Sequence, residues 1–276
     1  MNEKPIVQAP RERPLSHEPN LDCGFCPRLA VFRNSLRATR PEWHNAPVPS
    51  FGARDAHLLV VGLAPGLRGA NRTGRPFTGD FAGDLLYETL IEFGFATGTY
   101  GARCDDGLRL VSGAITNAVR CVPPQNKPAP SEIQNCRPFL AATIAAMPRL
   151  RAIVALGRVA HESIVRAFGL RLAVFPFAHG AEHVLTALDH QSKIMKVIDS
   201  KSSERDAAVS TFPHPAREAE VAVISSPPSA KTHASARTVV LFDSYHCSRY
   251  NTNTGVLTKD MFRAVFAKVR ESLGSP

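Results

Sequence analysis

Four cysteines are spaced as ligands of a metal centre would be. Cys23 and Cys26 form a Cys-x-x-Cys pair, a spacing that lets both thiols reach one metal centre, and Cys121 and Cys136 form a second pair. Four thiolates could hold a tetrahedral zinc ion or an iron–sulfur cluster, and the spacing alone does not choose between these groups. The simpler alternative is one ordinary Cys-x-x-Cys pair together with two buried structural cysteines.

The second chemical signal is the segment 62–80, GLAPGLRGANRTGRPFTGD, which follows an apolar run. Its glycines allow a ligand to approach the backbone closely, its prolines stiffen the path, and its arginines attract phosphate. The segment ends with an aromatic residue, Phe77, and a carboxylate, Asp80. It lacks both the Gly-Lys-Ser/Thr ending of a Walker loop and the GxGxxG spacing. The segment is therefore a candidate ligand-binding loop, with phosphate binding alone as the simpler alternative.

Strands that alternate with helices must position these residues. Apolar runs predict strands over residues 57–63, 111–119, 152–156 and 239–242, and apolar residues at helical spacing follow each run. This alternation predicts a single α/β domain, in which a central, mostly parallel sheet is flanked by helices. Ligands bind such sheets at the carboxyl ends of the strands. The loops after Leu63, Val119 and Phe242 are therefore the expected site.

Local signals place the helix boundaries. Ser131, with Gln134 three residues later, predicts a capping box, and Pro138 is expected to kink or divide the helix that follows. Thr258 is the expected cap of the closing helix. His179 and His183 are four residues apart, but Gly180 argues against a helix between them, so a positioning role is favoured over metal binding.

Two stretches do not fit the alternating pattern. Residues 1–20 carry four prolines and mixed charge, and they predict a disordered N-terminal tail before a domain that spans 21–276. Residues 187–238 are rich in Ser, Ala, Lys and Pro, and such a long irregular stretch within a domain predicts an insertion. The His214-Pro215 pair within it is not assigned a function.

Composition narrows the functional classes. The chain has 276 residues, of which 44% are hydrophobic, and this excludes a wholly disordered chain. The formal charge of +9 favours a polyanionic partner. No apolar run is long enough to span a membrane, and the N-terminal segment lacks the apolar centre of a secretory signal. These features predict a cytoplasmic protein, in which structural disulfides are not expected.

Three motifs, in this order, resemble those of the family-5 (B-type) uracil-DNA glycosylases of bacteria and archaea. They are segment 62–80 with CGFC upstream, TNAVRCVPPQNKPAPSEIQNC, and DSYHCSRYNTNTG. The resemblance implies a uracil-DNA glycosylase-like fold and a four-iron four-sulfur (4Fe-4S) cluster. The implied activity is base excision repair, in which uracil, and potentially other deaminated bases such as hypoxanthine, is flipped out and hydrolysed from DNA. The implied partner is double- or single-stranded DNA, bound by a monomer in the cytoplasm at the nucleoid.

The resemblance also implies residue roles. Asp80 matches the catalytic carboxylate, and His246 matches the histidine that faces the departing base. Phe77 matches the aromatic residue that stacks on the flipped base, and Asn117 matches the amide that reads the uracil edge. Related family-4 enzymes carry a carboxylate two residues before the motif proline. This chain has Leu63 there, which favours family 5 and places the catalytic role on Asp80.

The remaining implied residues fall into three groups. The cluster ligands are Cys23, Cys26, Cys121 and Cys136. The other substrate-binding residues are Gly62, Ala64, Pro65 and Gly66. The expected DNA contacts are Arg68, Arg72, Arg75, Arg249 and Asn251.

Each of these roles has a plainer alternative. Asp80 could only cap the helix that follows it, Phe77 could be a core residue, and His246 could be a loop histidine with its hydrogen bonds satisfied. Asn117 could serve a turn, and loop arginines are commonly only solvated. For the whole chain, the alternatives are a non-catalytic DNA-binding protein of the same fold, stabilised by iron–sulfur or zinc, and a zinc-stabilised hydrolase with another substrate.

Overall fold

The computed structural model describes residues 18–187 and 237–274. Most of the expected tail and insertion, including His214-Pro215, therefore lies outside the described residues. Residues 18–20 of the expected tail are described, and they are not a free tail. The carboxylate of Glu18 accepts hydrogen bonds from Arg120 at 2.9 Å and from the Ser50 amide at 3.1 Å. The ordered domain thus begins before Leu21.

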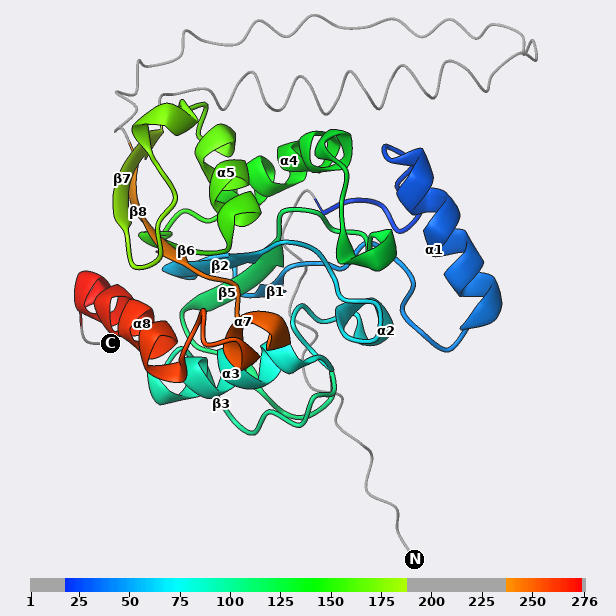
Figure 1. Cartoon of the computed structure of the whole chain (residues 1–276), viewed down its shortest axis with the longest axis horizontal. Helices are drawn as coiled ribbons and strands as arrows, with labels where there is room; N and C mark the ends of the chain where they lie inside the picture. Colours follow the sequence, from blue (N-terminus) through cyan, green and yellow to red (C-terminus); the bar gives the residue numbers. More distant parts are fainter. Residues whose placement is uncertain (1–17, 188–236, 275–276) are drawn as a thin grey trace, which may run out of the picture.

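One six-stranded sheet forms the centre, in the order β1-β5-β2-β6-β8-β7 (Figure 1). Its strands are β1 (Phe51–Gly52), β2 (Leu58–Gly62), β5 (Gly113–Asn117), β6 (Ala152–Leu156), β7 (Glu182–Ala187) and β8 (Arg237–Ser244). The four inner strands are parallel, and β1 and β7 pair antiparallel at the two edges. Every residue of β2, β5 and β6 is buried. A strand that is covered on both faces has a continuous run of apolar residues, and such runs predicted these strands from the sequence.

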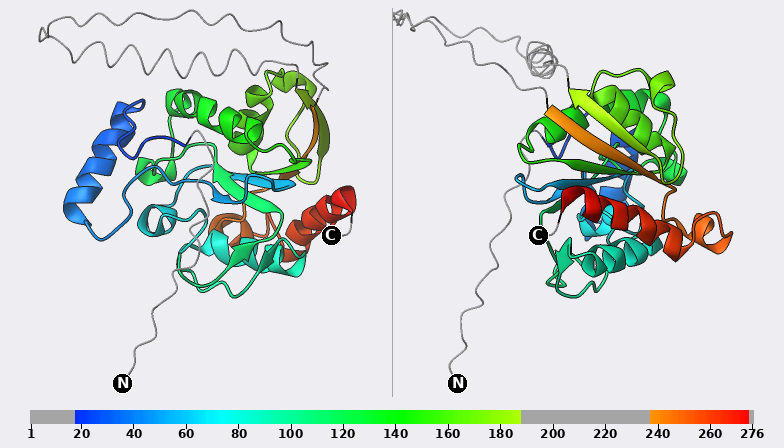
Figure 2. Two further views of the ribbon diagram at one scale, coloured as in Figure 1. Left: turned by 180° about the vertical axis from the view of Figure 1, so that it is seen from behind. Right: turned by 90° about the vertical axis from the view of Figure 1, so that its left-hand side faces the viewer.

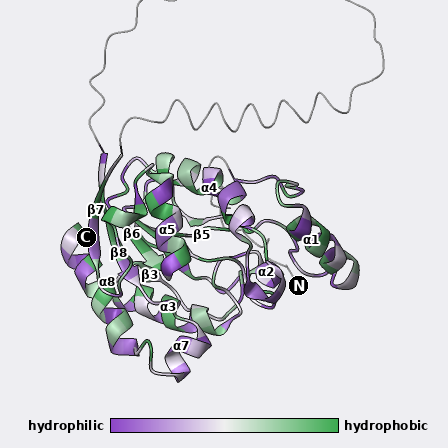
Figure 3. Ribbon diagram, turned by 45° about the horizontal axis from the view of Figure 1, so that its top comes forward, coloured by the Kyte–Doolittle hydropathy of each residue, from purple (hydrophilic) through white to green (hydrophobic). Residues whose placement is uncertain are grey.

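Helices cover both faces of this sheet (Figure 2). On one face α4 (Pro130–Ala145) and α5 (Arg158–Ala167) bury Leu140, Ile144 and Ile164. On the other face α3 (Phe81–Glu92) and α8 (Lys259–Leu273) bury Leu86 and Phe266. Hydrophobic residues gather in the central strands and on the inner sides of the helices (Figure 3). Within the described ranges, no helix has the length and apolar character that crossing a membrane requires.

The remaining elements lie outside the central sheet and its four covering helices. They are α1 (Pro27–Thr39), α2 (Ala70–Thr73), α7 (Arg249–Asn253), the short 3₁₀ helices η1 (Pro124–Asn126) and η2 (Leu172–Val174), and the hairpin of β3 (Ala96–Thr97) and β4 (Arg109–Leu110). The inner strands point their carboxyl ends toward α1, α2 and η1, so the connecting loops gather there.

The predicted elements are largely confirmed, with local corrections. The capping box of Ser131 and Gln134 is wrong, because α4 begins earlier and the Ala129 amide donates to Glu132 Oε2 at 2.7 Å. Pro138 lies inside α4 without dividing it. The prediction for Thr258 is correct, since its hydroxyl accepts a hydrogen bond from the Met261 amide.

Both borders of the expected insertion are also corrected. The strand predicted at 239–242 extends over Arg237–Ser244, because its first residues pair with β7. Strand β7 was not predicted, and it ends at Ala187, inside the expected insertion. As an edge strand it is only partly covered, with Val184 63% exposed, so it lacks the apolar run that identified the inner strands.

Candidate active site

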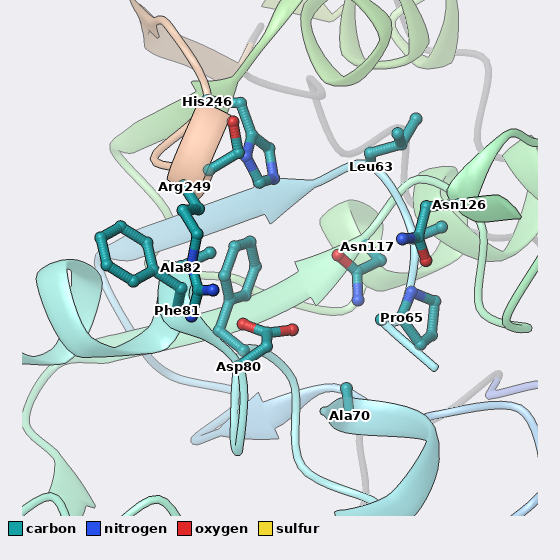
Figure 4. A pocket seen from close by; sticks show the side chains of 14 residues that line it. Leu63, Pro65, Ala70, Asp80, Phe81, Ala82, Asn117, Asn126, His246 and Arg249 are labelled. Atoms are coloured by element: carbon teal, nitrogen blue, oxygen red, sulfur yellow. The ribbon is translucent and has the colours of Figure 1, made fainter. Parts of the chain in front are cut away.

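A cavity of about 380 Å³ opens at the carboxyl edge of the sheet. The loops after β2, β5 and β8 form its walls, as expected for parallel strands. Figure 4 shows Asp80 and His246 reaching this cavity from different sides, with Asn117 and Asn126 along a third. Its lining residues are Leu63, Ala64, Pro65, Gly66, Ala70, Phe77, Asp80, Phe81, Ala82, Asn117, Asn126, His246, Ser248 and Arg249.

Asp80 stands at the N-cap position of α3, and its carboxylate is only partly engaged there. Its side chain makes no capping hydrogen bond, and its Oδ1 atom is buried without a hydrogen-bond partner. Burial raises the pKa of Asp80, while the amides of Gly83 and Ala82 at the helix N-terminus act in the opposite direction. The favourable action of these two amides is that of a helix cap, so a capping role is compatible with the structure, while Oδ1 is left available to a ligand.

The glycines of segment 62–80 make room for these side chains. A Cβ atom on Gly66 would lie 2.7 Å from Asp80 Oδ2, and one on Gly69 would be closer still. A Cβ atom on Gly62 would meet the Phe77 ring and lie 2.5 Å from Asn117 Oδ1. Any larger residue at these positions would displace a cavity side chain. The glycine-rich pattern thus reflects side-chain packing around the cavity.

Phe77 has a strained backbone and a buried ring. Its φ angle of +54° lies in the left-handed region, which is unfavourable for a bulky residue, and only 6% of the residue is exposed. The Tyr100 hydroxyl donates to the Phe77 carbonyl at 3.1 Å and helps to fix this conformation. The ring packs in the core on one side and lines the cavity on the other. The core alternative is therefore correct for only one face of the ring.

The His246 ring lines the cavity and lies next to the Phe77 ring. Their ring centroids are 6.0 Å apart and the rings are nearly parallel. Burial lowers the pKa of His246 to about 4, so the imidazole is neutral at physiological pH. Two hydrogen bonds hold the backbone at this point. Asn251 Nδ2 donates to the His246 carbonyl at 2.8 Å, and Sγ of the next residue, Cys247, donates to the Ala82 carbonyl at 3.4 Å. The loop is thereby fixed with the ring at the cavity.

Asn117 ends β5 and points into the same space. It is 3% exposed, and its Oδ1 atom is buried without a hydrogen-bond partner. A turn-forming asparagine would use this oxygen locally, so the turn alternative is not supported. Of the other predicted substrate-binding residues, Ala64, Pro65 and Gly66 line the cavity, whereas Gly62 lies behind Phe77 and Asn117.

The predicted DNA contacts divide into two groups. Arg68, Arg72 and Arg249 are exposed, and Arg249 also lines the cavity. For Arg75 the expectation is wrong. It is 5% exposed and forms a two-pronged ion pair with Asp106, at 2.8 and 2.6 Å, so its charge is neutralised within the fold.

Asn251 also has a different role from the expected one. It is partly buried, and its side-chain amide is engaged with the carbonyl of His246. The amide therefore holds the loop that carries His246, which is a structural use of a residue expected to contact DNA.

Sequence reasoning missed Asn126, the second amide at the cavity. Asn126 is exposed, and both it and Gln125 have left-handed backbone angles, with φ of +57° and +56°. The only signal was its place in the proline-rich stretch after Cys121, which was treated as a connection. The arrangement also places Ser248 and Phe81 on the cavity wall.

The four predicted ligand cysteines come together beside α1. Cys23, Cys26, Cys121 and Cys136 line one small cavity, although they lie far apart in the sequence. Burial raises the pKa of Cys121 to about 11 and that of Cys136 to about 12, and the neighbouring thiols add to the effect. These thiols are therefore protonated without a metal, and a bound metal would displace the protons, because the thiolate is the ligand form.

Polar hydrogens already face three of the sulfur atoms. The Arg120 amide donates to Cys136 Sγ at 3.3 Å, Arg33 donates to Cys121 Sγ at 3.9 Å, and Asn135 donates to Cys26 Sγ at 3.9 Å. Such donors stabilise the negative charge of ligating thiolates. The alternative of a lone Cys-x-x-Cys pair with two unrelated cysteines is therefore not supported.

The spacing of the sulfur atoms also bears on the kind of metal centre. Ligands of one tetrahedral zinc ion, at about 2.3 Å from the metal, lie about 3.8 Å from one another. No three of these sulfur atoms lie within 4.8 Å of one another, although all six cysteines belong to the described ranges. A polynuclear cluster binds one thiolate at each iron and so accepts a wider set. Four thiols that line one cavity can supply the thiolates of a metal centre.

Comparisons with known proteins agree with this geometry. The family model of the uracil DNA glycosylase superfamily matches residues 49–270. The chain is 36% identical to the type-5 uracil-DNA glycosylase of Thermus thermophilus over 258 residues, which cover 91% of this chain and 94% of that protein. It is 38% identical to the type-5 enzyme of Pyrobaculum aerophilum over 56% of this chain and 70% of that protein. A type-4 enzyme, from Archaeoglobus fulgidus, is 32% identical over 54% of this chain and 68% of that protein.

Proposed function

The chain belongs to the uracil-DNA glycosylase superfamily, and from this premise we propose that it excises uracil from DNA by hydrolysing the N-glycosidic bond. The matched type-5 enzymes and the cavity at the carboxyl edge of the sheet both support this reaction. It requires the protein to take one base out of the duplex, hold it, and stabilise the charges that form as the bond breaks.

The cavity can hold the flipped base against Phe77. Rotating a nucleotide out of the duplex costs a few kcal/mol, and stacking on one aromatic ring returns about 1–3 kcal/mol. The Phe77 ring is held by the core behind it, so little ordering is needed when a base stacks on it. The nearly parallel His246 ring narrows the same space.

Asp80 stabilises the positive charge that develops on the sugar. A carboxylate about 4 Å from that charge, at an effective dielectric constant near 20, contributes about 4 kcal/mol. This energy corresponds to about three orders of magnitude in rate. The unpartnered Oδ1 atom is free for this task, or for orienting the attacking water.

His246 stabilises the negative charge that develops on the departing uracil. The neutral imidazole can donate one hydrogen bond from the cavity wall to a uracil oxygen. A preorganised donor of this kind contributes about 3 kcal/mol to a transition state. Asp80 and His246 thus divide the two developing charges between the sugar and the base.

Asn117 recognises the base by hydrogen bonds. A side-chain amide carries both an acceptor and donors, and uracil presents both an N–H group and carbonyl oxygens on its pairing edge. The buried, unpartnered Oδ1 atom of Asn117 would accept the N–H of uracil. Cytosine has no N–H group at that position, so the oxygen would remain unsatisfied and cytosine would be disfavoured.

The positive charge of the chain supports DNA as the partner. Arg249 lies at the cavity, and Arg68 and Arg72 are exposed on the segment that forms another of its walls. These side chains can hold phosphates on either side of the extracted nucleotide. One chain supplies every wall of the cavity, so the proposal takes the protein to act as a monomer.

The four cysteines are proposed to hold a 4Fe-4S cluster. When bound, the cluster would supply a structural link, since its ligands join the segment before α1, the loop after β5, and α4. Cys121 follows Asn117 by four residues, so the link fixes the strand end that carries the base-reading amide. The excision chemistry rests on the side chains of the cavity.

The observation that carries the proposal is the convergence of Asp80, Phe77 and His246 on one cavity. The test is a single-turnover excision assay on duplexes that contain one uracil, with hypoxanthine-containing and single-stranded substrates measured alongside. We expect uracil release that Asp80→Asn abolishes or greatly slows while DNA affinity is retained. Tight binding to uracil-containing DNA without base release would favour the non-catalytic alternative instead.

A further inference from the structure

A second cluster of titratable side chains lies outside the cavity. His161 on α5, His183 on β7 and Asp243 on β8 bring their ligand atoms within 4.8 Å of one another. His161 is 1% exposed and Asp243 is fully buried. None of the three lines the cavity, so direct contact with a base cannot explain them.

Both ring nitrogens of His161 face oxygen atoms that accept hydrogen bonds. Nδ1 lies 2.7 Å from Asp243 Oδ1, and Nε2 lies 2.8 Å from the carbonyl oxygen of Phe175. A neutral imidazole has only one N–H group, so making both bonds requires the imidazolium form. Burial opposes this charge, but the Asp243 carboxylate, the Phe175 carbonyl and Glu162, the next residue on α5, together outweigh it, so the pKa of His161 is raised.

The other oxygen of Asp243 is also occupied by donors. Asp243 Oδ2 lies 3.4 Å from the Ala178 amide and 3.2 Å from His183 Nε2. Both oxygens of Asp243 are therefore engaged, Oδ1 by the His161 ring and Oδ2 by the Ala178 amide. His183 packs edge-on against the His161 ring at 5.4 Å and closes the cluster on the side of β7.

This pair fixes the segment 175–181, which in turn holds the residue before His246. Besides the bonds to Phe175 and Ala178, the Gly180 amide donates to the Asp243 carbonyl at 2.8 Å. From the same segment, His179 Nδ1 accepts a hydrogen bond from the Tyr245 amide at 3.1 Å. The His179 and Tyr245 rings stack at 4.9 Å.

We propose that His161 and Asp243 form a buried imidazolium–carboxylate pair that positions His246 for base excision. The pair is connected to His246 in two ways: Asp243 lies three residues before it on the same strand and loop, and the segment 175–181 bonds to both Asp243 and Tyr245. His161 and Asp243 are thus positioning residues, and this inference rests on the proposed function of the cavity.

The first test needs no activity. In ¹⁵N-labelled full-length protein at pH 7, two-bond ¹H–¹⁵N spectra report the protonation of each ring nitrogen of His161. We expect both nitrogens to be protonated, with assignment by comparison with His161→Asn. A neutral His161 ring at pH 7 would overturn the inference. So would one equivalent of zinc that copurifies and is lost in His183→Ala, because the cluster would then be a metal site.

The second test is a double-mutant cycle on single-turnover excision. Asp243→Asn is expected to slow excision by about 10- to 100-fold, as a small misplacement of a reacting group does. In a His246→Ala background the same change is expected to slow excision less than about twofold, because the group that it positions is gone. Equal losses in both backgrounds would show that Asp243 does not act through His246. Arg166→Gln, at an exposed position of the same helix and outside the pair, is the matched control and should leave the rate unchanged.

The two tests separate the inference from its premise. If no variant and no wild-type sample releases uracil, the proposed function fails, while the nitrogen spectra still report on the pair. If the wild-type protein is active and His161 is neutral, only the inference fails. If Asp243→Asn does not fold, His161→Asn takes its place in the cycle.

Discussion

The base cavity and the cysteine site both lie at the carboxyl edge of the sheet. They differ in how the polar atoms around each site are hydrogen-bonded. In the cavity, Asp80 Oδ1 and Asn117 Oδ1 are buried without partners, and Phe77 keeps a strained backbone. Around the cysteines, side-chain and backbone donors face the sulfur atoms, and the buried atoms without partners are donors, Arg33 Nε and Arg120 Nε, rather than acceptor oxygens. Near Cys26, Arg28 forms a two-pronged ion pair with Glu132, at 2.8 and 2.7 Å.

The difference indicates what each region does. A buried polar atom without a partner destabilises the fold by about 1–3 kcal/mol, and where such an atom is an acceptor oxygen at an open cavity a ligand can satisfy it. A site whose donors are already directed at its ligand atoms is organised to hold a permanent group. We infer that the cavity serves a transient substrate and that the cysteine site serves the fold.

The largest expected effect is the loss of excision rate when Asp80, in the base cavity, loses its charge. Asp80→Asn removes the negative charge while keeping the shape of the side chain, and we expect single-turnover uracil excision to fall by about three orders of magnitude. DNA affinity, measured by fluorescence anisotropy on a non-hydrolysable substrate, should change little. A rate within tenfold of wild type would remove Asp80 from the chemistry.

The next effect concerns His246 and is expected to be smaller. His246→Asn replaces the ring donor with one that is shorter, and we expect a loss of about 100-fold in the same assay. In wild-type protein the rate should fall as the pH is lowered, because burial raises the pKa of Asp80 and its protonation removes the negative charge that stabilises the sugar cation. His246 stays neutral until the pH approaches about 4. In Asp80→Asn this acidic decline should disappear; an unchanged acidic limb would assign it to another group.

The corresponding change in the cysteine site should act on the fold. Cys136→Ala removes a buried ligand, and we expect loss of iron together with a loss of about 2–5 kcal/mol in the free energy of unfolding. The measurements are iron content, visible absorption and chemical denaturation. Cys104→Ala, at an exposed cysteine outside the site, is the control. A Cys136→Ala protein with full iron content would remove this ligand from the set.

The smallest expected effect concerns Asn126, which lines the cavity on the loop that connects it to the cysteine site. Asn126→Ala should raise the substrate concentration for half-maximal rate by about 3- to 10-fold, since an exposed side chain at the mouth contributes one hydrogen bond of about 1 kcal/mol. Gln125→Ala is the matched control, because its backbone is also left-handed and its side chain does not line the cavity. Equal effects of the two changes would attribute them to the loop backbone.

The sequence could predict the inner sheet because these strands are covered on both faces. Their apolar runs gave β2, β5, β6 and part of β8, and the parallel order then located the cavity. The edge strand β7 was missed, because partial cover leaves no such run. The cavity residues Asp80, Phe77 and His246 came from motifs, since composition alone did not distinguish one histidine or phenylalanine from another.

Residues that act through long-range contacts could not be predicted. The sequence indicates that Arg75 contacts phosphate, but in the fold Asp106, 31 residues later, neutralises its charge. The motif predicts a DNA contact for Asn251, but in the fold its side-chain amide donates to the His246 carbonyl. His161 and Asp243 are 82 residues apart and share no motif. Each of these pairs is defined only by the folded chain.

The thermal stability of Asp80→Asn at pH 7 tests the contrast between the two regions most directly. Because burial raises the pKa of Asp80 above its unfolded value, the ionised carboxylate destabilises the folded state at neutral pH, and this penalty is relieved as the pH falls. The account predicts that Asp80→Asn melts at the same temperature as wild type or higher, even though its excision rate is lost. A melting temperature lowered as far as that of Cys136→Ala would contradict it, because Asp80 would then serve the fold.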